Sequence, residues 1–366
     1  RSTSSHRSSR RSPVREERRM QYRPLGATGI HVSHIGLGAM SFGALGNRDH
    51  DDCVRIVHRA LDAGVNLVDT ADVYSAGESE VIVGKALRGR RDDVVLATKC
   101  FWPMGTNHNR RGGSRRWVLR ACDESLARLD TDWIDIYYLH KPDLSTDIEE
   151  TLGAMDALVR SGKVRVVALS TFPADLLVEA QWAAARANLA RPRAEQPPYS
   201  IFVRGIERDV LPVCARFGMG VLVWSPLNGG WLSGRYGRDR WPSGTRAERW
   251  QARSGRGWDR QRPEVQRKLD LLDSLEAIAR DAGLPLSHLA LAFSHAHPAV
   301  TASLVGPRTH EQLDDMLAAA DVHLDHDVLD AIDAVVAPGD VVDPSCDRGW
   351  IPPWISDPRL RRRDAR

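Results

Sequence analysis

The sequence has no run of about 18 apolar residues, the length that crosses a membrane as a helix, so no membrane partner is expected. Cysteine is scarce: the five cysteines are scattered and never form a Cys-x-x-Cys pair. This scarcity argues against a disulfide framework and favours a reducing compartment, which we take to be the cytoplasm. His288, His295 and His297 are close in sequence, but no acid or cysteine completes a ligand set, so we expect no metal site.

The residues between the two ends of the chain also lack an excess of positive charge. The formal net charge is +3, but residues 1–19 contribute +5 and residues 359–366 contribute +4, which leaves −6 for the rest. An acidic body does not suit a phosphate backbone, so we expect no nucleic-acid partner. Residues 1–19 are mostly Arg and Ser, which predicts a disordered tail. A transit peptide has a similar composition but lacks acids, whereas this segment contains Glu16 and Glu17.

The glycine pattern of a Rossmann dinucleotide-binding fold is incomplete. Gly36 and Gly38 have the spacing of its first two glycines, but Ser41 stands where the third is needed. Close backbone approach at the end of a strand explains two glycines equally well.

Strand and helix patterns alternate along most of the chain. Residues 22–32 read as a hairpin, and strand patterns then occur near residues 35, 66, 94, 134, 164, 194, 220 and 300 with helical patterns between them. Eight such units predict an α/β fold, a (β/α)8 TIM barrel with an N-terminal β-hairpin. We therefore divide the chain into a tail at 1–19, a barrel at 20–338 and a C-terminal extension at 339–366.

Two long segments, 101–113 and 226–262, follow strands and are therefore placed on the C-terminal face of the barrel, where barrel active sites form. They and the C-terminal extension are rich in aromatic residues: Phe101, Trp102, Trp231, Trp241, Trp250, Trp258, Trp350 and Trp354. This concentration suggests an apolar substrate cleft.

Three successive predicted strands end on an ionisable residue. The strand near 66 ends at Asp69, the next at Lys99 and the third at His140, and Tyr74 follows Asp69 in a loop. The ends of neighbouring parallel strands lie side by side, so a carboxylate, an ammonium, an imidazole and a phenol would converge. That set predicts a proton-transfer site.

From about residue 20 to 335 the chain resembles the aldo-keto reductases, in particular the branch that includes potassium-channel β subunits and related bacterial reductases. The resemblance rests on ordered motifs: Tyr22-Arg23-x-Leu25-Gly26-x-Thr28-Gly29, Asn66-x-x-Asp69-Thr70-Ala71-x-x-Tyr74, Ala97-Thr98-Lys99, Asp132-x-Ile134-Asp135-x-Tyr137-x-Leu139-His140, Gly162-Lys163-Val164-Arg165, Trp224-Ser225-Pro226-Leu227 and Val305-Gly306-Pro307-Arg308-x-x-x-Gln312-Leu313.

The resemblance implies NADPH-dependent reduction of an aldehyde or ketone to an alcohol by hydride transfer, with NADP(H) on the C-terminal face. It implies that Tyr74 is the general acid, that Lys99 lowers the pKa of Tyr74, that Asp69 holds Lys99 and that His140 orients the carbonyl or completes a proton relay. This agrees with the residues themselves, because a phenol is too weak an acid at neutral pH without a cation beside it. The expected partner is a small carbonyl substrate, and a homo-oligomer is compatible with the sequence.

The resemblance also implies a set of cofactor contacts. The carboxamide of the nicotinamide would be held by Ser170, Thr171 and Gln196, with Thr171 standing where the family usually has Asn. Trp224 would stack on the ring, and the segment after it would wrap the pyrophosphate. Gly306 and Arg308 would take the adenosine 2′-phosphate, with Gln312 beside the adenosine. The full set is Ser170, Thr171, Gln196, Trp224, Ser225, Pro226, Leu227, Gly229, Leu232, Ser233, Gly306, Arg308 and Gln312.

Two other functions compete with reduction. A Schiff-base aldolase on the same barrel would use Lys99 as its nucleophile, but Asp69 beside it would keep the lysine charged. A regulatory or scaffold subunit that senses the cofactor with little turnover would have the same fold. Measured turnover on an aldehyde separates that function from a reductase.

Overall fold

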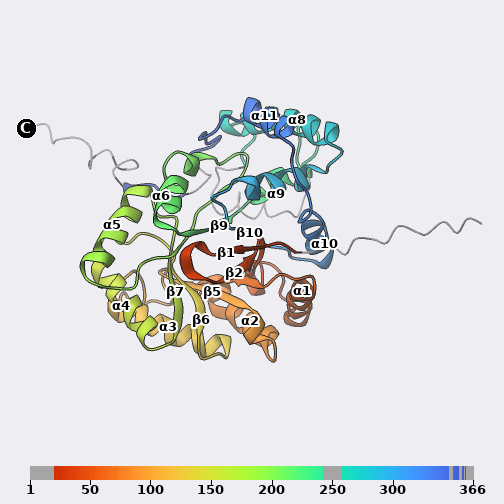
Figure 1. Ribbon diagram of the computed structural model, residues 1–366. Coiled ribbons are helices and arrows are strands. Elements are labelled where there is room, and N and C mark those ends of the chain that lie inside the picture. The colour runs from red at the N-terminus through yellow and green to blue at the C-terminus, as the bar shows by residue number, and fades with distance from the viewer. Residues whose placement is uncertain (1–19, 242–257, 346–348, 354–356, 358, 360–366) are drawn as a thin grey trace, which may run out of the picture.

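Eight parallel strands close into a barrel ringed by helices, as predicted (Figure 1). The computed structural model describes residues 20–241, 258–345, 349–353, 357 and 359, so the predicted tail, Trp250 and Trp354 lie outside the described residues. The barrel strands are β3 (Ile35–Gly38), β4 (Leu67–Asp69), β5 (Val95–Cys100), β6 (Ile134–Leu139), β7 (Val164–Ser170), β8 (Ala194–Gln196), β9 (Gly220–Trp224) and β10 (Ala302–Val305). Closure occurs between β10 and β3, which pair in parallel.

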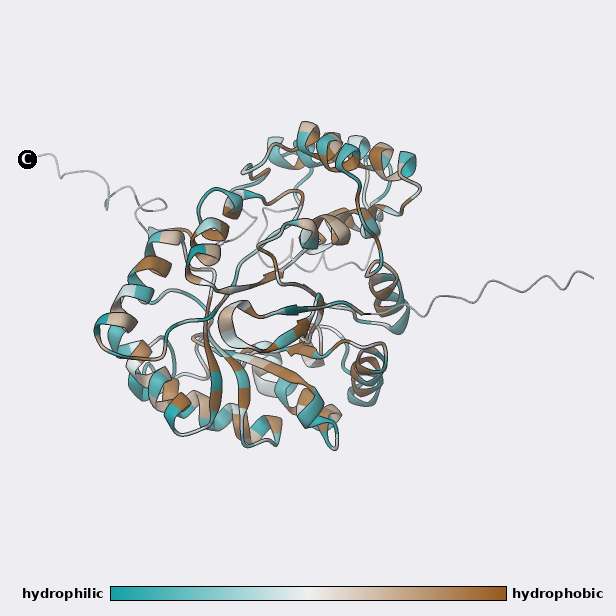
Figure 2. Cartoon of the chain, viewed as in Figure 1, coloured by the Kyte–Doolittle hydropathy of each residue, from teal (hydrophilic) through white to brown (hydrophobic). Residues whose placement is uncertain are grey.

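Ten helices of the described chain surround the barrel. They are α1 (His50–Asp62), α2 (Glu78–Leu87), α3 (Arg115–Leu129), α4 (Ile148–Arg160), α5 (Ala174–Arg186), α6 (Val210–Phe217), α8 (Pro263–Asp281), α9 (Leu286–Ala296), α10 (His310–Ala318) and α11 (His326–Val335). Figure 2 shows brown strands inside and mixed brown and teal on the helices around them, as expected for amphipathic helices over a buried sheet. The sequence analysis did not anticipate α11.

Local sequence explains where α1 starts and which face it buries. The Asp49 carboxylate accepts the Asp52 backbone N–H, and Asp51 and Asp52 occupy the first turn, where the helix dipole favours negative charge. Ile56 and Val57 lie on its buried face.

The N-terminal hairpin closes one end of the barrel. β1 (Tyr22–Pro24) and β2 (His31–Ser33) pair antiparallel and lie near the centre of the ring of helices in Figure 1. Leu25 and Val32 are completely buried against the inward-facing residues of the barrel strands. In the connecting turn Gly26 has φ +51°, and a Cβ there would lie 2.3 Å from the Gly218 carbonyl oxygen, so only glycine fits.

The predicted tryptophan-lined cleft needs correction. Trp231 and Trp258 stack with ring centroids 4.4 Å apart, and Trp241 packs edge-on against both. The three tryptophan rings pack against one another and against Tyr236 and do not line the cleft described below, whereas Tyr236 and the predicted Trp102 do line it. The long segment after β9 is therefore anchored by its own aromatic cluster.

Two helix glycines with opposite surroundings give a matched test of the packing. A Cβ on Gly84 in α2 would lie 2.5 Å from the Leu129 backbone oxygen of α3, whereas the nearest atom to one on Gly153 in α4 is 3.8 Å away. Gly153→Ala should raise the free energy of unfolding by roughly 0.5–1 kcal/mol through helix propensity. Gly84→Ala should lower it by about 1–3 kcal/mol, because the helices must separate. Denaturant titration measures both; equal stabilisation by the two changes would contradict close α2–α3 packing.

Candidate active site

The C-terminal ends of the strands gather the predicted catalytic residues. Asp69 is the last residue of β4 and pairs in register with Ala97, two residues before Lys99 on β5. His140 follows β6 directly, and Lys99 lies in register with Tyr138. Parallel register thus brings residues far apart in sequence to one face, as the sequence analysis predicted.

Lys99 and Asp69 form a buried ion pair. Lys99 is completely buried and Asp69 is 3% exposed, and the Lys99 ammonium donates to Asp69 Oδ1 at 2.5 Å and to the Thr70 carbonyl at 2.8 Å. Burial opposes the lysine charge, but Asp69 and Tyr74 together outweigh it, so the pKa of Lys99 is raised above its ordinary value. Lys99 therefore carries a permanent positive charge.

Tyr74 and His140 lie on the cleft side of this pair. The Lys99 Nζ is 5.1 Å from the centroid of the Tyr74 ring, and the two side chains are hydrogen-bonded. The rings of Tyr74 and His140 meet edge to face with centroids 5.8 Å apart. Burial, and then the charges of Lys99 and Lys141, hold the pKa of His140 well below its ordinary value, so the imidazole is neutral at pH 7.

Gln196 connects the ion pair to the predicted carboxamide seat. Its side-chain N–H donates to Asp69 Oδ2 at 2.8 Å, so Asp69 accepts from Lys99 on one oxygen and from Gln196 on the other. An acceptor on that side fixes the orientation of the amide: Gln196 presents its nitrogen to Asp69. The sequence analysis gave Gln196 only a cofactor contact and missed this one.

A cleft of about 780 Å³ runs from these residues across the C-terminal face. Tyr74, His140 and Trp102 line it, and so do Arg308 and Gln312. Of the predicted cofactor contacts, these line the cleft: Ser170, Thr171, Gln196, Trp224, Ser225, Pro226, Leu227, Gly229, Ser233, Gly306, Arg308 and Gln312. Leu232 does not: it is completely buried in the core cluster, so its contacts are with the protein.

Backbone strain is concentrated around the cleft. Seven non-glycine residues of the described chain have positive φ; among them Ser75 and Ala76 directly follow Tyr74, and Thr171, Ser225 and Asn228 follow barrel strands. Such conformations cost roughly 1–3 kcal/mol each and persist only where the surroundings enforce them. Thr171, at φ +59°, is the most unfavourable, because it is β-branched.

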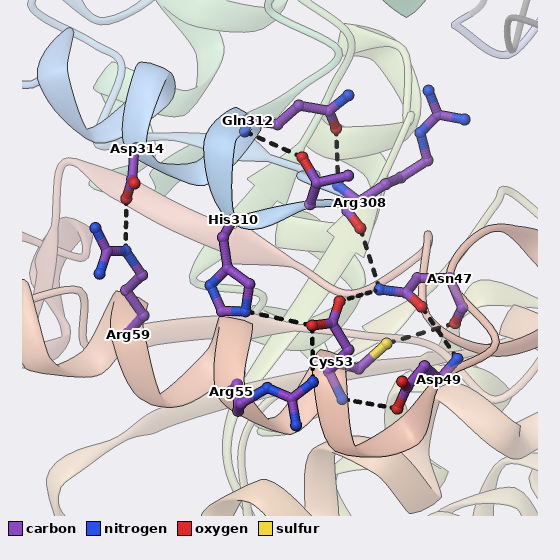
Figure 3. Close-up of polar contacts among 11 residues, drawn as sticks. Asn47, Asp49, Cys53, Arg55, Arg59, Arg308, His310, Gln312 and Asp314 are labelled. Carbon is purple, nitrogen blue, oxygen red and sulfur yellow. Dashed lines mark hydrogen bonds and ion pairs between the residues drawn. The ribbon is translucent and has the colours of Figure 1, made fainter.

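The far end of the cleft is formed at the start of α10 (Figure 3). The Gln312 side-chain oxygen accepts the Arg308 backbone N–H at 2.9 Å, and the Arg308 carbonyl accepts from Asn47 at 3.1 Å. Figure 3 shows the Arg308 side chain extending away from this contact with Asn47. Hydrogen bonds to its backbone thus fix the position of Arg308, and its guanidinium group lies on the side away from Asn47.

Several cleft residues were not assigned by the sequence analysis. Lys141 lines the cleft beside His140, Arg235 lies in the segment after β9, and Glu311 and Asp315 lie near Arg308. Arg235 belongs to a Gly-Arg-Tyr run after Ser233, which was a usable signal. The positions of Lys141, Glu311 and Asp315 depend on helix and loop geometry, which the sequence does not show directly.

The described part of the chain holds neither a cluster of three metal-ligating side chains nor a helix long and apolar enough to cross a membrane.

Comparison with known proteins agrees with this geometry. The Aldo/keto reductase family profile matches residues 34–337. The chain is 35% identical over 326 residues to a probable voltage-gated potassium channel subunit beta of Oryza sativa subsp. japonica, covering 87% of this chain and 97% of that protein. It is 37% identical over 322 residues to the uncharacterized oxidoreductase YrpG of Bacillus subtilis (strain 168), covering 85% and 94%. The barrel fold and the family match identify the chain as an oxidoreductase of the TIM-barrel type. This chain belongs to the aldo/keto reductase family.

The buried pair gives a prediction that is independent of the reaction. Asp69→Asn should lower the free energy of unfolding at pH 7 by about 3–5 kcal/mol, because it leaves the Lys99 charge buried without a counter-ion. In that variant the pKa of Lys99 should fall below its unfolded value, so the unfolded state binds more protons. The deficit should therefore shrink as pH rises from neutrality towards about 10.4, the unfolded lysine value.

Urea titrations at several pH values measure this deficit. Asp62→Asn, which breaks an exposed pair with Arg90, is the control and should cost about 0–1 kcal/mol. A deficit for Asp69→Asn that does not change with pH would mean that the Lys99 charge is not its cause.

Proposed function

We propose that this protein reduces an aldehyde or ketone to an alcohol with NADPH as the hydride donor. The observation that carries the proposal is the Lys99–Asp69 pair beside a cleft-lining Tyr74. A charged ammonium against a phenol can stabilise the phenolate that is left when the phenol gives its proton away, which supports a role in general acid catalysis.

The residues divide the work as follows. Tyr74 donates its proton to the carbonyl oxygen as negative charge develops there, and Lys99 stabilises the resulting phenolate. Asp69 keeps Lys99 charged and in place. His140, neutral and with its ring edge against Tyr74, orients the carbonyl oxygen towards the phenol. When bound, the nicotinamide supplies the hydride.

The cleft residues suit an extended dinucleotide. Buried polar groups at Ser170 and Gln196 provide donors and acceptors for a carboxamide, and Trp224 offers an aromatic surface beside them. Arg308 provides a cation at the far end, beside the N-terminus of α10, where backbone N–H groups favour a phosphate. The two ends are joined by the segment after Trp224, whose glycines permit close backbone approach.

A channel-associated subunit and a Schiff-base aldolase are the two alternative functions. The plant relatives are named as probable voltage-gated potassium channel subunits, which suggests a channel-associated subunit as the alternative. The intact set of Tyr74, Lys99, Asp69 and His140 favours catalysis. An aldolase with Lys99 as nucleophile needs a deprotonated lysine, and the raised pKa of Lys99 opposes it.

Turnover of the wild type and of two tyrosine variants tests the proposal. Two phenol rings flank Lys99, with Nζ 5.1 Å from the Tyr74 centroid and 5.7 Å from that of Tyr138, but only Tyr74 lines the cleft. Tyr74→Phe should lower kcat for aldehyde reduction by roughly 10²–10⁴-fold and leave NADPH binding intact. Tyr138→Phe should keep most of the activity. A Tyr74→Phe protein with more than about a tenth of wild-type kcat would remove Tyr74 as the acid.

Cofactor choice is tested at Arg308. A charged hydrogen bond contributes roughly 1.5–3 kcal/mol, so the wild type should bind NADPH about 10- to 150-fold more tightly than NADH. Arg308→Ala should weaken NADPH by that factor and leave NADH nearly unchanged, as measured by fluorescence titration.

The control is Arg59→Ala. Arg59 pairs with Asp314 on α10 but does not line the cleft, so both affinities should stay within about twofold. Equal weakening of NADPH and NADH in Arg308→Ala would place Arg308 at the pyrophosphate or in the fold instead of at the 2′-phosphate.

A further inference from the structure

One buried acid next to the cleft has no part in the proposed proton transfer. Glu195 precedes Gln196 on β8, is completely buried, and has one carboxylate oxygen with no hydrogen-bond partner among the described residues. Burial raises the pKa of Glu195 well above its ordinary value, so the site is unfavourable for a carboxylate. An acid held at such a position needs a reason.

The other oxygen of the Glu195 carboxyl group makes hydrogen-bond contact with the turn after β7, which explains why an acid is held there. Glu195 Oε1 accepts the Phe172 backbone N–H at 3.0 Å, and the carboxyl group also lies near the N–H of Thr171, which donates to the Gln196 carbonyl. These two residues form the turn that leaves β7, and Thr171 adopts φ +59° there. A β-branched side chain disfavours that conformation, and the hydrogen bond from Glu195 to the N–H that directly follows Thr171 opposes its relaxation.

The same turn fixes the polar groups at the nicotinamide end. Thr171 N–H donates to the Gln196 carbonyl at 3.2 Å, and the Thr171 hydroxyl donates to the Ser170 carbonyl at 2.7 Å. The Ser170 hydroxyl donates to the Gln196 carbonyl at 2.9 Å. A change in the Thr171 conformation would therefore shift both residues that face the carboxamide.

We infer that Glu195 is a positioning residue for the nicotinamide end of the cofactor. Its carboxyl oxygen accepts the Phe172 N–H and so holds Thr171 in the left-handed conformation that places Ser170 and Gln196 beside the carboxamide. The inference rests on the proposed function, because it concerns the seat of the proposed cofactor.

Calorimetric titration with two ligands tests this role. NADPH fills the whole cleft, whereas 2′-phospho-ADP-ribose lacks the nicotinamide and occupies the rest. Glu195→Met, which removes both acceptors, should weaken NADPH by about tenfold and leave 2′-phospho-ADP-ribose within about twofold. Glu195→Gln keeps an oxygen for the Phe172 N–H and should bind NADPH within about threefold of wild type.

The strained conformation of Thr171 allows a test with a second variant, Thr171→Gly. Glycine adopts positive φ without cost, so in a Thr171→Gly background the same Glu195→Met change should weaken NADPH by less than about threefold. A purely structural role for Glu195 would lower the melting temperature without this dependence on Thr171. If Glu195→Met does not fold, Glu195→Asp withdraws the carboxylate by one methylene and should give the same pattern with a smaller factor.

The outcomes separate the two proposals. A wild-type protein that binds neither ligand would overturn the proposed function, and this inference with it. A wild type that binds both, with Glu195→Met weakening both equally or neither, would overturn the positioning role alone.

Discussion

The constraint on which the site depends is the buried charge of Lys99. An ammonium removed from water is tolerated only with a counter-ion and further acceptors, and here Asp69 and the Thr70 carbonyl supply them. Asp69 in turn needs its second oxygen satisfied, and Gln196 satisfies it. The ion pair and the hydrogen bond to Gln196 therefore link β4, β5 and β8 across the barrel. The phenol ring of Tyr74 lies beside Lys99 and lines the cleft.

The barrel makes such a chain possible because its register is fixed by burial. Each strand is covered on both faces, so a slip of one residue would expose apolar side chains and bury polar ones. The hairpin fills one end with Leu25 and Val32, which leaves the other end for polar groups. Strain stored at Thr171, Ser225 and Asn228 lies at that same polar end. Stability supplied by the apolar core thus maintains conformations that the loops would not adopt alone.

Much of this arrangement could be predicted from the sequence. The eight strands follow from apolar runs separated by amphipathic helices, and the convergence of Asp69, Lys99 and His140 follows from their places at strand ends. The rest depends on side-chain packing. Periodicity could not show that Trp231, Trp241 and Trp258 bury one another. Nor could it place Leu232 in the core, or reveal that Glu195 accepts from the turn after β7, because those contacts are set in three dimensions.

The most direct test of the account follows the hydrogen atom itself. The protein is incubated with an aromatic aldehyde and NADPH carrying deuterium at both C4 positions, and the alcohol is analysed by mass spectrometry and NMR. The account predicts one deuterium on the carbinol carbon of each product molecule, formed in step with the loss of reduced-nicotinamide absorbance. An alcohol without deuterium, or no consumption of NADPH across aromatic aldehydes, sugars, quinones and ketosteroids, would contradict it.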